Sequence, residues 1–127
     1  VRMNACGRIE WRLEEAGHHS ISRTEKGSFW IPGVDYPLRT TSARYQNGYP
    51  GIDHPAALET ALHVSETGTV LETVNILDVL YQNGLERYLS KAFQPQAGNS
   101  GPNTEDLLHM NDVEALPPSI AEEYPPL

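Results

Sequence analysis

The sequence predicts an all-β protein, a partial β-propeller of about one and a half blades with a short helical insertion at residues 75–93. Three polar turns end in glycine, and alternating apolar positions follow each of them, at Gly7, Gly27 and Gly68. Strand-like stretches also precede the second and third turns, which makes two successive hairpins. Four antiparallel strands in chain order are typical of one propeller blade or of one meander of a sandwich.

The blade is expected over residues 18–74, with its hairpins at 18–33 and 57–74. Residues 1–13 are expected to supply the last strand of a preceding blade. Between the two hairpins, residues 34–56 consist largely of turn formers, so we expect a long loop there.

Helical periodicity begins after the second hairpin. Ile76, Val79 and Leu80 recur at helical spacing, and Asn75 with Asp78 resembles an N-cap pair. The Asn-Gly pair that follows is expected to end this helix, and a second short helix is expected after it.

The remaining residues are expected to open a further blade. Residues 94–106 are typical of a flexible connector, and the stretch "LLHMNDVEAL" predicts the first strand of the next blade within 105–117. The Pro-rich end from residue 117 onward is typical of loop or polyproline-like coil. Because the chain starts at Val1 in a strand-like pattern and its sheet edges would stay open, we expect a piece of a longer protein.

The charge of the chain is acidic and uneven. The formal net charge is −8, with seven basic and five acidic groups in residues 1–44, two and six in 45–98, and none and six in 99–127. Phosphate binding needs clustered Lys and Arg, so nucleic acid is not an expected partner. No apolar run approaches the roughly 20 residues that cross a bilayer, so no membrane partner is expected. Cys6 is the only cysteine, which excludes a disulfide within the chain.

Two strand-like stretches carry histidine at the first-strand position that lines the central channel of a propeller. "HHSIS" holds His18 and His19, which point to opposite sides, and "LLHMNDVEAL" holds His109 and Asn111, which point to the same side. When the two stretches are superposed with Ile21 on Val113, His19 lies over Asn111. This favours His19 as the histidine that points toward the central channel. Imidazoles with a carboxamide suit either an oxyanion or a divalent metal. The other two histidines, His54 and His63, are expected to be structural.

These stretches also resemble a known family. "GRIEWRLEEAGHHSISRTEKGSFWIPG", "LHVSETGTVLETVNILDVLYQNGL" and "DLLHMNDVEAL", in this order and spacing, resemble segments of the arylsulfotransferases, the PAPS-independent aryl-sulfate sulfotransferases. The resemblance covers roughly residues 7–116. It implies a six-bladed propeller with the site at its central channel. It also implies that a sulfuryl group passes from a phenolic sulfate to a phenol through a transiently sulfated histidine, without any cofactor.

Carried over by motif, the resemblance implies that His19 and His109 are catalytic and that His18 and Asn111 bind the substrate, with no metal. The family's sulfate-accepting histidine lies on a later blade, and none of the five histidines here matches its motif, so this chain alone is expected to be inactive. The implied partners are a small aryl sulfate, a phenol and the remaining propeller blades, and a homo-oligomer is left open. The family is exported, which implies a periplasmic or extracellular location.

Two other classes of protein fit the same residues. A calcium-dependent lactonase-like propeller carries an N-D-[IV] signature like Asn111-Asp112-Val113, in which Asn111 would ligate the metal through its side-chain oxygen. A non-catalytic propeller would instead present its acidic loops and residues 34–56 to a partner. Loss of activity in chelator would favour the lactonase. Full-length protein that fails to release nitrophenol from nitrophenyl sulfate with a phenol acceptor would favour the interaction module.

Overall fold

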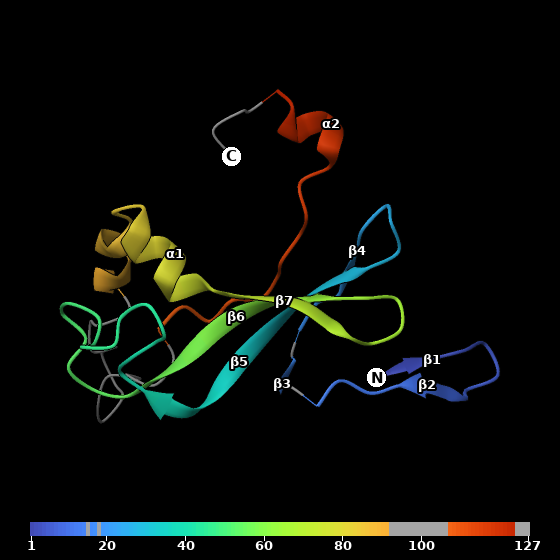
Figure 1. Ribbon diagram of the computed structural model, residues 1–127, viewed down its shortest axis with the longest axis horizontal. Coiled ribbons are helices and arrows are strands. Elements are labelled where there is room, and N and C mark those ends of the chain that lie inside the picture. Colours follow the sequence, from blue (N-terminus) through green and yellow to red (C-terminus); the bar gives the residue numbers. More distant parts are fainter. Residues whose placement is uncertain (15, 18, 92–106, 124–127) are drawn as a thin grey trace. The chain divides into compact units, whose positions relative to one another are not determined.

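The structure is a computed structural model, and it describes residues 1–14, 16–17, 19–91 and 107–123. Its elements in chain order are β1 (Arg2–Met3), β2 (Ile9–Trp11), β3 (Ala16–Gly17), β4 (Ser22–Arg23), β5 (Phe29–Arg39), β6 (Ala56–Val64), β7 (Val70–Asn75), α1 (Ile76–Gln82), η1 (Glu86–Lys91) and α2 (Pro118–Ala121). Strands in antiparallel sheets make up most of the regular structure and helix is scarce, which confirms the predicted all-β class (Figure 1).

The main sheet follows the order of the chain. Strands β3, β5, β6 and β7 lie side by side in this order, and β4 also pairs with β5. β4 and β5 are antiparallel, with Ser22 opposite Trp30 and Arg23 opposite Phe29. The turns of both predicted hairpins are therefore confirmed, but the first strand of the first hairpin is shorter than predicted, because β4 begins only at Ser22. The strands form one meander of four positions, and β3 and β4 share the first of these positions, since both pair with β5. A separate two-stranded sheet pairs β1 with β2.

The three turns predicted from glycine share one backbone geometry. In each turn, the glycine N–H donates to the carbonyl oxygen of the residue three positions earlier. That earlier residue in turn donates its N–H to the carbonyl oxygen of the residue after the glycine: Asn4 to Arg8, Thr24 to Ser28, and Ser65 to Thr69. The glycines Gly7, Gly27 and Gly68 have φ of 76°, 85° and 88°. A side chain strongly disfavours this left-handed conformation, which explains why glycine recurs at these positions.

The chain divides into two compact units, each with its own core. The first unit comprises Val1–Gly33, Ala61–Thr73 and Asn111–Leu127, and the second comprises Val34–Thr60 and Val74–Met110. In the first unit the buried core is Ile31, Leu62 and Val64, with Trp11, Leu13, Phe29 and Val70 packed against it. β6 lies inside the sheet, between β5 and β7, and its residues supply buried side chains to both cores.

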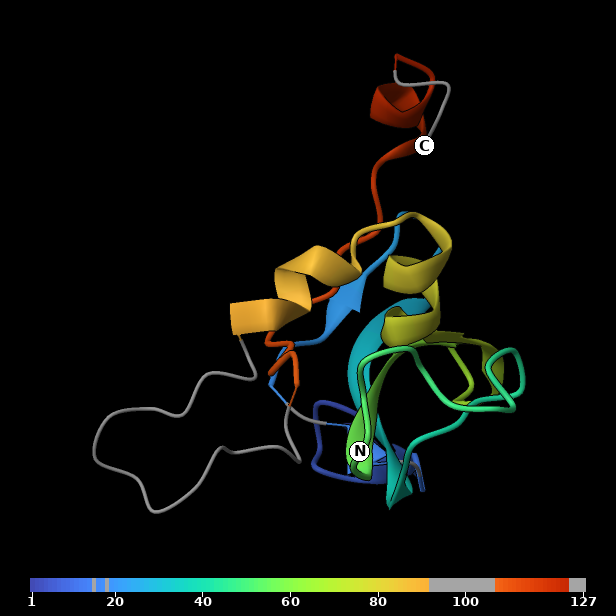
Figure 2. The same cartoon turned by 90° about the vertical axis from the view of Figure 1, so that its left-hand side faces the viewer.

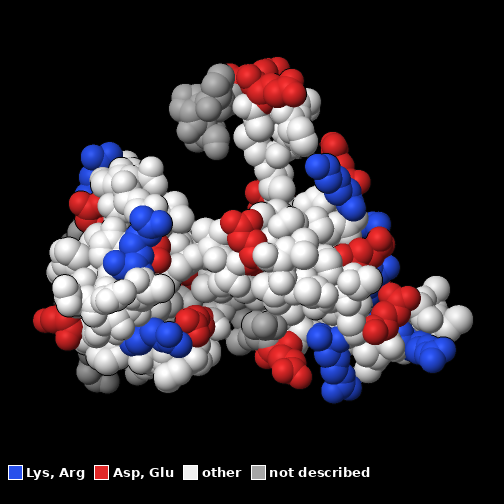
Figure 3. Space-filling model, in the orientation of Figure 1, with Lys and Arg blue, Asp and Glu red and all other residues white. Residues whose placement is uncertain are grey.

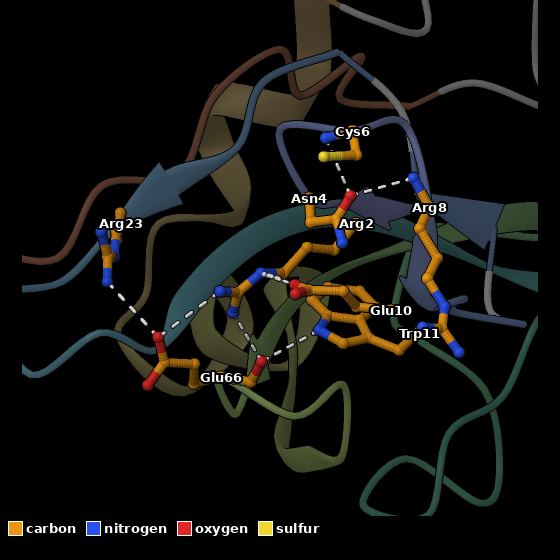
Figure 4. A network of polar contacts seen from close by, with 8 residues as sticks. All are labelled: Arg2, Asn4, Cys6, Arg8, Glu10, Trp11, Arg23 and Glu66. Carbon is orange, nitrogen blue, oxygen red and sulfur yellow. Dashed lines mark hydrogen bonds and ion pairs between the residues drawn. The ribbon is translucent and has the colours of Figure 1, made fainter.

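A polar network holds the β1–β2 hairpin within the first unit (Figure 4). The backbone oxygen of Glu66, in the β6–β7 turn, accepts from Arg2 Nη1 at 2.8 Å and from Trp11 Nε1 at 2.9 Å. The Glu66 carboxylate lies 3.6 Å from Arg2 and 3.5 Å from Arg23, and Arg2 Nε lies 2.8 Å from Glu10. Exposed ion pairs of this kind contribute little to stability, so the two bonds to the backbone oxygen are the stronger anchors.

In the second unit, the loop 40–55 packs on α1. The core is formed by Tyr49, Ile52, Ala56, Leu58, Leu77, Leu89 and Leu107, with partly buried Tyr45, Leu80, Tyr81 and Leu108. Asn75 caps α1 by accepting the N–H of Asp78 at 3.1 Å, as predicted. The helix ends at Asn83, next to Gly84 with φ of 65°. Figure 2 shows α1 in yellow and η1 in orange, the two short helices expected within 75–93.

Tyr49 ties this loop to the helix through its hydroxyl group. The side chain is 2 % exposed, and its hydroxyl donates to Asp78 Oδ1 at 2.6 Å, while Ser42 Oγ donates to the same oxygen at 2.7 Å. Burial, followed by the hydrogen bond to Asp78, raises the pKa of Tyr49 well above its ordinary value of 10.0.

Replacing Tyr49 with phenylalanine should lower the free energy of unfolding by about 1.5 kcal/mol, because a buried charge-assisted hydrogen bond is lost. Tyr36→Phe, at a 62 % exposed side chain, is the control and should change little. The raised pKa also means that the unfolded chain loses the Tyr49 proton first, so stability should fall as pH rises above about 10. Urea titrations at pH 8 and pH 10.5 measure both effects. An equal pH dependence in the Tyr49→Phe protein would contradict this assignment.

The structure differs from the predictions at several places. The stretch around His19 is not a strand, because β4 begins only at Ser22. The long loop is 40–55 rather than 34–56, because β5 continues to Arg39. Residues 107–117 form no strand. His109 has a positive φ there, and the nearby N–H groups of Met110 and Val113 donate to carboxylates instead of a sheet neighbour. The Pro-rich end contains the short helix α2, which starts at a proline, a residue well suited to the first helical position.

Candidate functional site

His19 lies where the first position of the meander is interrupted. β3 ends at Gly17 and β4 begins at Ser22, and both pair with β5, while residues 19–21 are not part of a strand. His19 is exposed there, with φ of 62°. The strand alternation that was used to choose between the paired histidines therefore does not apply at this point. His18 lies outside the described residues.

His109 and Asn111 lie in the non-strand segment that replaces the predicted last strand. Both are exposed, and His109 has φ of 49°. Among the described residues, His19 and His109 are the only non-glycine residues with positive φ. Of the two compact units, the second contains His109, and the first contains His19 and Asn111.

A hydrogen bond joins the two predicted stretches within the first unit. Ser20 Oγ donates to Asp112 Oδ1, across 92 positions of sequence. The same carboxylate oxygen accepts the N–H of Val113 at 2.9 Å, which holds Asp112 in place. Ser20 and Asp112 are the immediate neighbours of His19 and Asn111 in the chain, so the structure brings these two predicted site segments together.

A buried carboxylate anchors the stretch that contains His109. Glu59, in the middle of β6, is only 4 % exposed, and its Oε2 accepts the N–H of Met110 at 2.6 Å. At 2.6 Å this is a short hydrogen bond from a backbone N–H to a side-chain oxygen. Met110 stands between His109 and Asn111, so this bond fixes the backbone between both predicted site residues.

A small pocket opens beside His19 in the first unit. Its volume is about 230 Å³, and apolar side chains of Trp11, Leu13 and Ile31 line it together with His19 and Ser20. An apolar wall with one imidazole at its edge suits a small ring that carries one polar group.

Sequence reasoning missed one polar group that the structure makes prominent, and it did not foresee the partners of another. Glu59 was not singled out, and its position in an otherwise apolar strand is the signal that could have identified it. His63, expected to be structural, stacks on Trp30 with ring centroids 4.7 Å apart and planes 9° apart, and its Nε2 lies 2.9 Å from Ser28 Oγ. These residues are distant in sequence, so spacing alone could not connect them.

No protein-family model, curated protein or solved structure matches this chain. Within residues 1–14, 16–17, 19–91 and 107–123, no group of three or more His, Cys, Asp or Glu side chains is arranged to hold a metal ion. None of the helices in the described part is long and apolar enough to span a bilayer. On the face drawn in Figure 3, basic side chains lie interspersed with acidic ones.

Proposed function

We propose that this chain forms part of a six-bladed aryl-sulfate sulfotransferase propeller, in which His19 and His109 are catalytic and His18 and Asn111 bind the substrate. β3 to β7 would be one blade, and the β1–β2 hairpin the end of the preceding one. The observation that carries the proposal is the left-handed backbone at both of the histidines that the sequence singles out. Residues held in this conformation cluster at functional sites.

The backbone energetics support this assignment. A left-handed conformation costs a non-glycine residue roughly 1–2 kcal/mol, so the surrounding structure must hold it. Each histidine has such an anchor beside it. Ser20 binds Asp112 next to His19, and Met110 binds Glu59 next to His109. Anchored backbones of this kind position side chains before a substrate arrives, which is what electrostatic catalysis requires.

The proposed chemistry assigns these residues to the phenolic oxygen and the sulfuryl group. In the first half-reaction the bond between sulfur and the donor's phenol oxygen breaks, and a histidine outside this chain forms a bond to sulfur. In the second, a phenol oxygen attacks that sulfur, the histidine leaves and the phenol proton is released. Imidazole donors would stabilise the charge that develops on the departing phenol oxygen, and Asn111 would donate to a sulfuryl oxygen. No cofactor takes part.

Binding of 4-nitrophenyl sulfate to the chain tests the site. In NMR spectra of the imidazole C–H groups, we expect the donor to shift the signals of His19 and His109 and leave His54 unchanged. His19→Gln and His109→Gln should each weaken binding, whereas His54→Gln should not. Shifts confined to His54 and His63, or no shift at millimolar donor, would remove the basis of the proposal.

Turnover should require the accepting histidine as well. The chain alone should release no nitrophenol from nitrophenyl sulfate with a phenol acceptor. In a protein that also contains that histidine, His19→Gln or His109→Gln should lower the rate by roughly 10²–10³-fold, the usual effect of removing one such donor. Loss of activity in chelator would favour the calcium-dependent lactonase class instead.

The backbone conformation at His109 has its own test. His109→Gly should leave the protein about 1 kcal/mol more stable than His109→Ala, because glycine adopts φ of 49° without strain. Both variants should lose the response to 4-nitrophenyl sulfate. Urea unfolding measures the difference, and equal stability of the two variants would show that the residue is not held in the left-handed region.

A further inference from the structure

A second pocket of about 290 Å³ lies in the first unit, beside the turn between β4 and β5. One wall is formed by the rings of Trp30 and His63, and Leu116 and Pro117 line the pocket as well. None of the residues that line it belongs to the proposed sulfuryl-transfer site. The volume is at the small end for ligand pockets and exceeds the roughly 150 Å³ cavity that accepts a benzene ring.

The aromatic wall is held in place by hydrogen bonds. Trp30 and His63 stack with ring centroids 4.7 Å apart and planes 9° apart. Ser28 Oγ lies 2.9 Å from His63 Nε2 and 2.7 Å from Thr24 Oγ1, so the imidazole is oriented from the base of the turn. A flat, preoriented aromatic wall favours a flat ligand, because little side-chain entropy is lost when the ligand binds.

The turn adds charge to this pocket. Lys26, Arg23 and Glu25 all line it. Arg23 is paired with Glu66 at 3.5 Å, whereas Lys26 forms no ion pair with any residue that the structure describes. With Arg23 paired, the remaining charged side chains of the lining are Lys26 and Glu25, and the Lys26 ammonium is the cation available to a ligand.

We propose that this pocket binds a small planar aromatic anion, with its ring against Trp30 and Leu116 and its charged group beside Lys26. The apolar and aromatic lining accounts for the ring, and the Lys26 ammonium accounts for the anionic group. A carboxylate and a sulfonate share this chemistry. The site is independent of the proposed transferase activity, because its residues lie outside the His19, His109 and Asn111 set.

Isothermal titration calorimetry with 2-naphthoate tests the proposal through opposite charge changes at neighbouring positions. Lys26→Gln should weaken binding roughly fivefold, and Glu25→Gln should strengthen it about twofold, because each removes a partly screened charge at the pocket. Both positions are exposed in a turn, so the fold should be unaffected. Arg44→Gln, an exposed charge change in the second unit, is the matched control and should leave binding unchanged.

Two further measurements locate the ligand and separate its chemical features. Neutral 2-naphthamide should bind more weakly than 2-naphthoate, and inorganic sulfate should not compete with either. In NMR spectra, 2-naphthoate should shift the indole N–H of Trp30 and not that of Trp11. Absence of binding at millimolar 2-naphthoate, equal affinity in the Lys26→Gln and Glu25→Gln proteins, or shifts at Trp11 alone would each overturn the proposal.

Discussion

Gly68→Ala should lower the free energy of unfolding by about 2–4 kcal/mol. A Cβ at this position would lie 2.6 Å and 2.7 Å from two ring carbons of Trp11 and 2.9 Å from its Cβ. These atoms are at the base of the Trp11 side chain, whose Nε1 also donates to Glu66, so the ring cannot simply rotate away. Overpacking of this kind costs about 1–3 kcal/mol, and the left-handed φ of 88° adds about 1 kcal/mol.

Gly7→Ala is the matched control for this prediction. Gly7 occupies the same position in the same kind of turn, with φ of 76°, but a Cβ there would meet no atom within 4 Å. Its substitution should therefore cost only the backbone part, about 1 kcal/mol. In a double-mutant cycle with Trp11→Ala, the cost of Gly68→Ala should fall to the same value. Equal destabilisation by Gly7→Ala and Gly68→Ala would contradict the packing of Trp11 on the turn.

Glu59→Ala should destabilise the chain by about 3 kcal/mol and release the segment that holds His109. The substitution removes a buried carboxylate that accepts the Met110 N–H at 2.6 Å, and it leaves that N–H without this acceptor. Glu59→Gln keeps an acceptor of the same shape and should cost about 1 kcal/mol. Urea unfolding measures the stability of both variants.

Hydrogen exchange separates this anchor from a general loss of stability. In the Glu59→Ala protein, the Met110 amide should exchange much faster under conditions in which the buried amides of β6 remain protected. The Glu59→Gln protein should show an intermediate rate. If Met110 and the β6 amides gained exchange by the same factor, Glu59 would be a core residue and not an anchor for the 107–113 segment.

Local sequence signals were sufficient for the hairpins and for the helical insertion. Gly7, Gly27 and Gly68 each take the positive φ that their turns require, because no other residue adopts it as easily. Asn75 and Asp78 form the helix cap for an equally local reason, since the side chain and the N–H it accepts are only three residues apart. Both features depend on neighbours in sequence, which the sequence shows directly.

Strand predictions failed where distant groups decide the backbone. The apolar alternation in 107–117 is typical of a strand, but the Glu59 carboxylate takes the Met110 N–H and His109 turns out of the extended region. The paired-histidine stretch was likewise predicted as one strand, and the structure divides it around His19. The alternation of apolar and polar residues indicates which side chains are buried. It does not indicate which distant group accepts a hydrogen bond from a given backbone N–H.

The sequence by itself determined the all-β class, the positions of the turns, and the choice of His19 and His109 as unusual residues. Only the tertiary structure decided that both histidines have left-handed backbones, that Ser20 meets Asp112, and that Trp30, His63 and Ser28 form one wall of a pocket. The physical reason is the range of the interactions. Turn and cap preferences act over a few residues, whereas these contacts join side chains 33 to 92 positions apart and exist only after the sheet has formed.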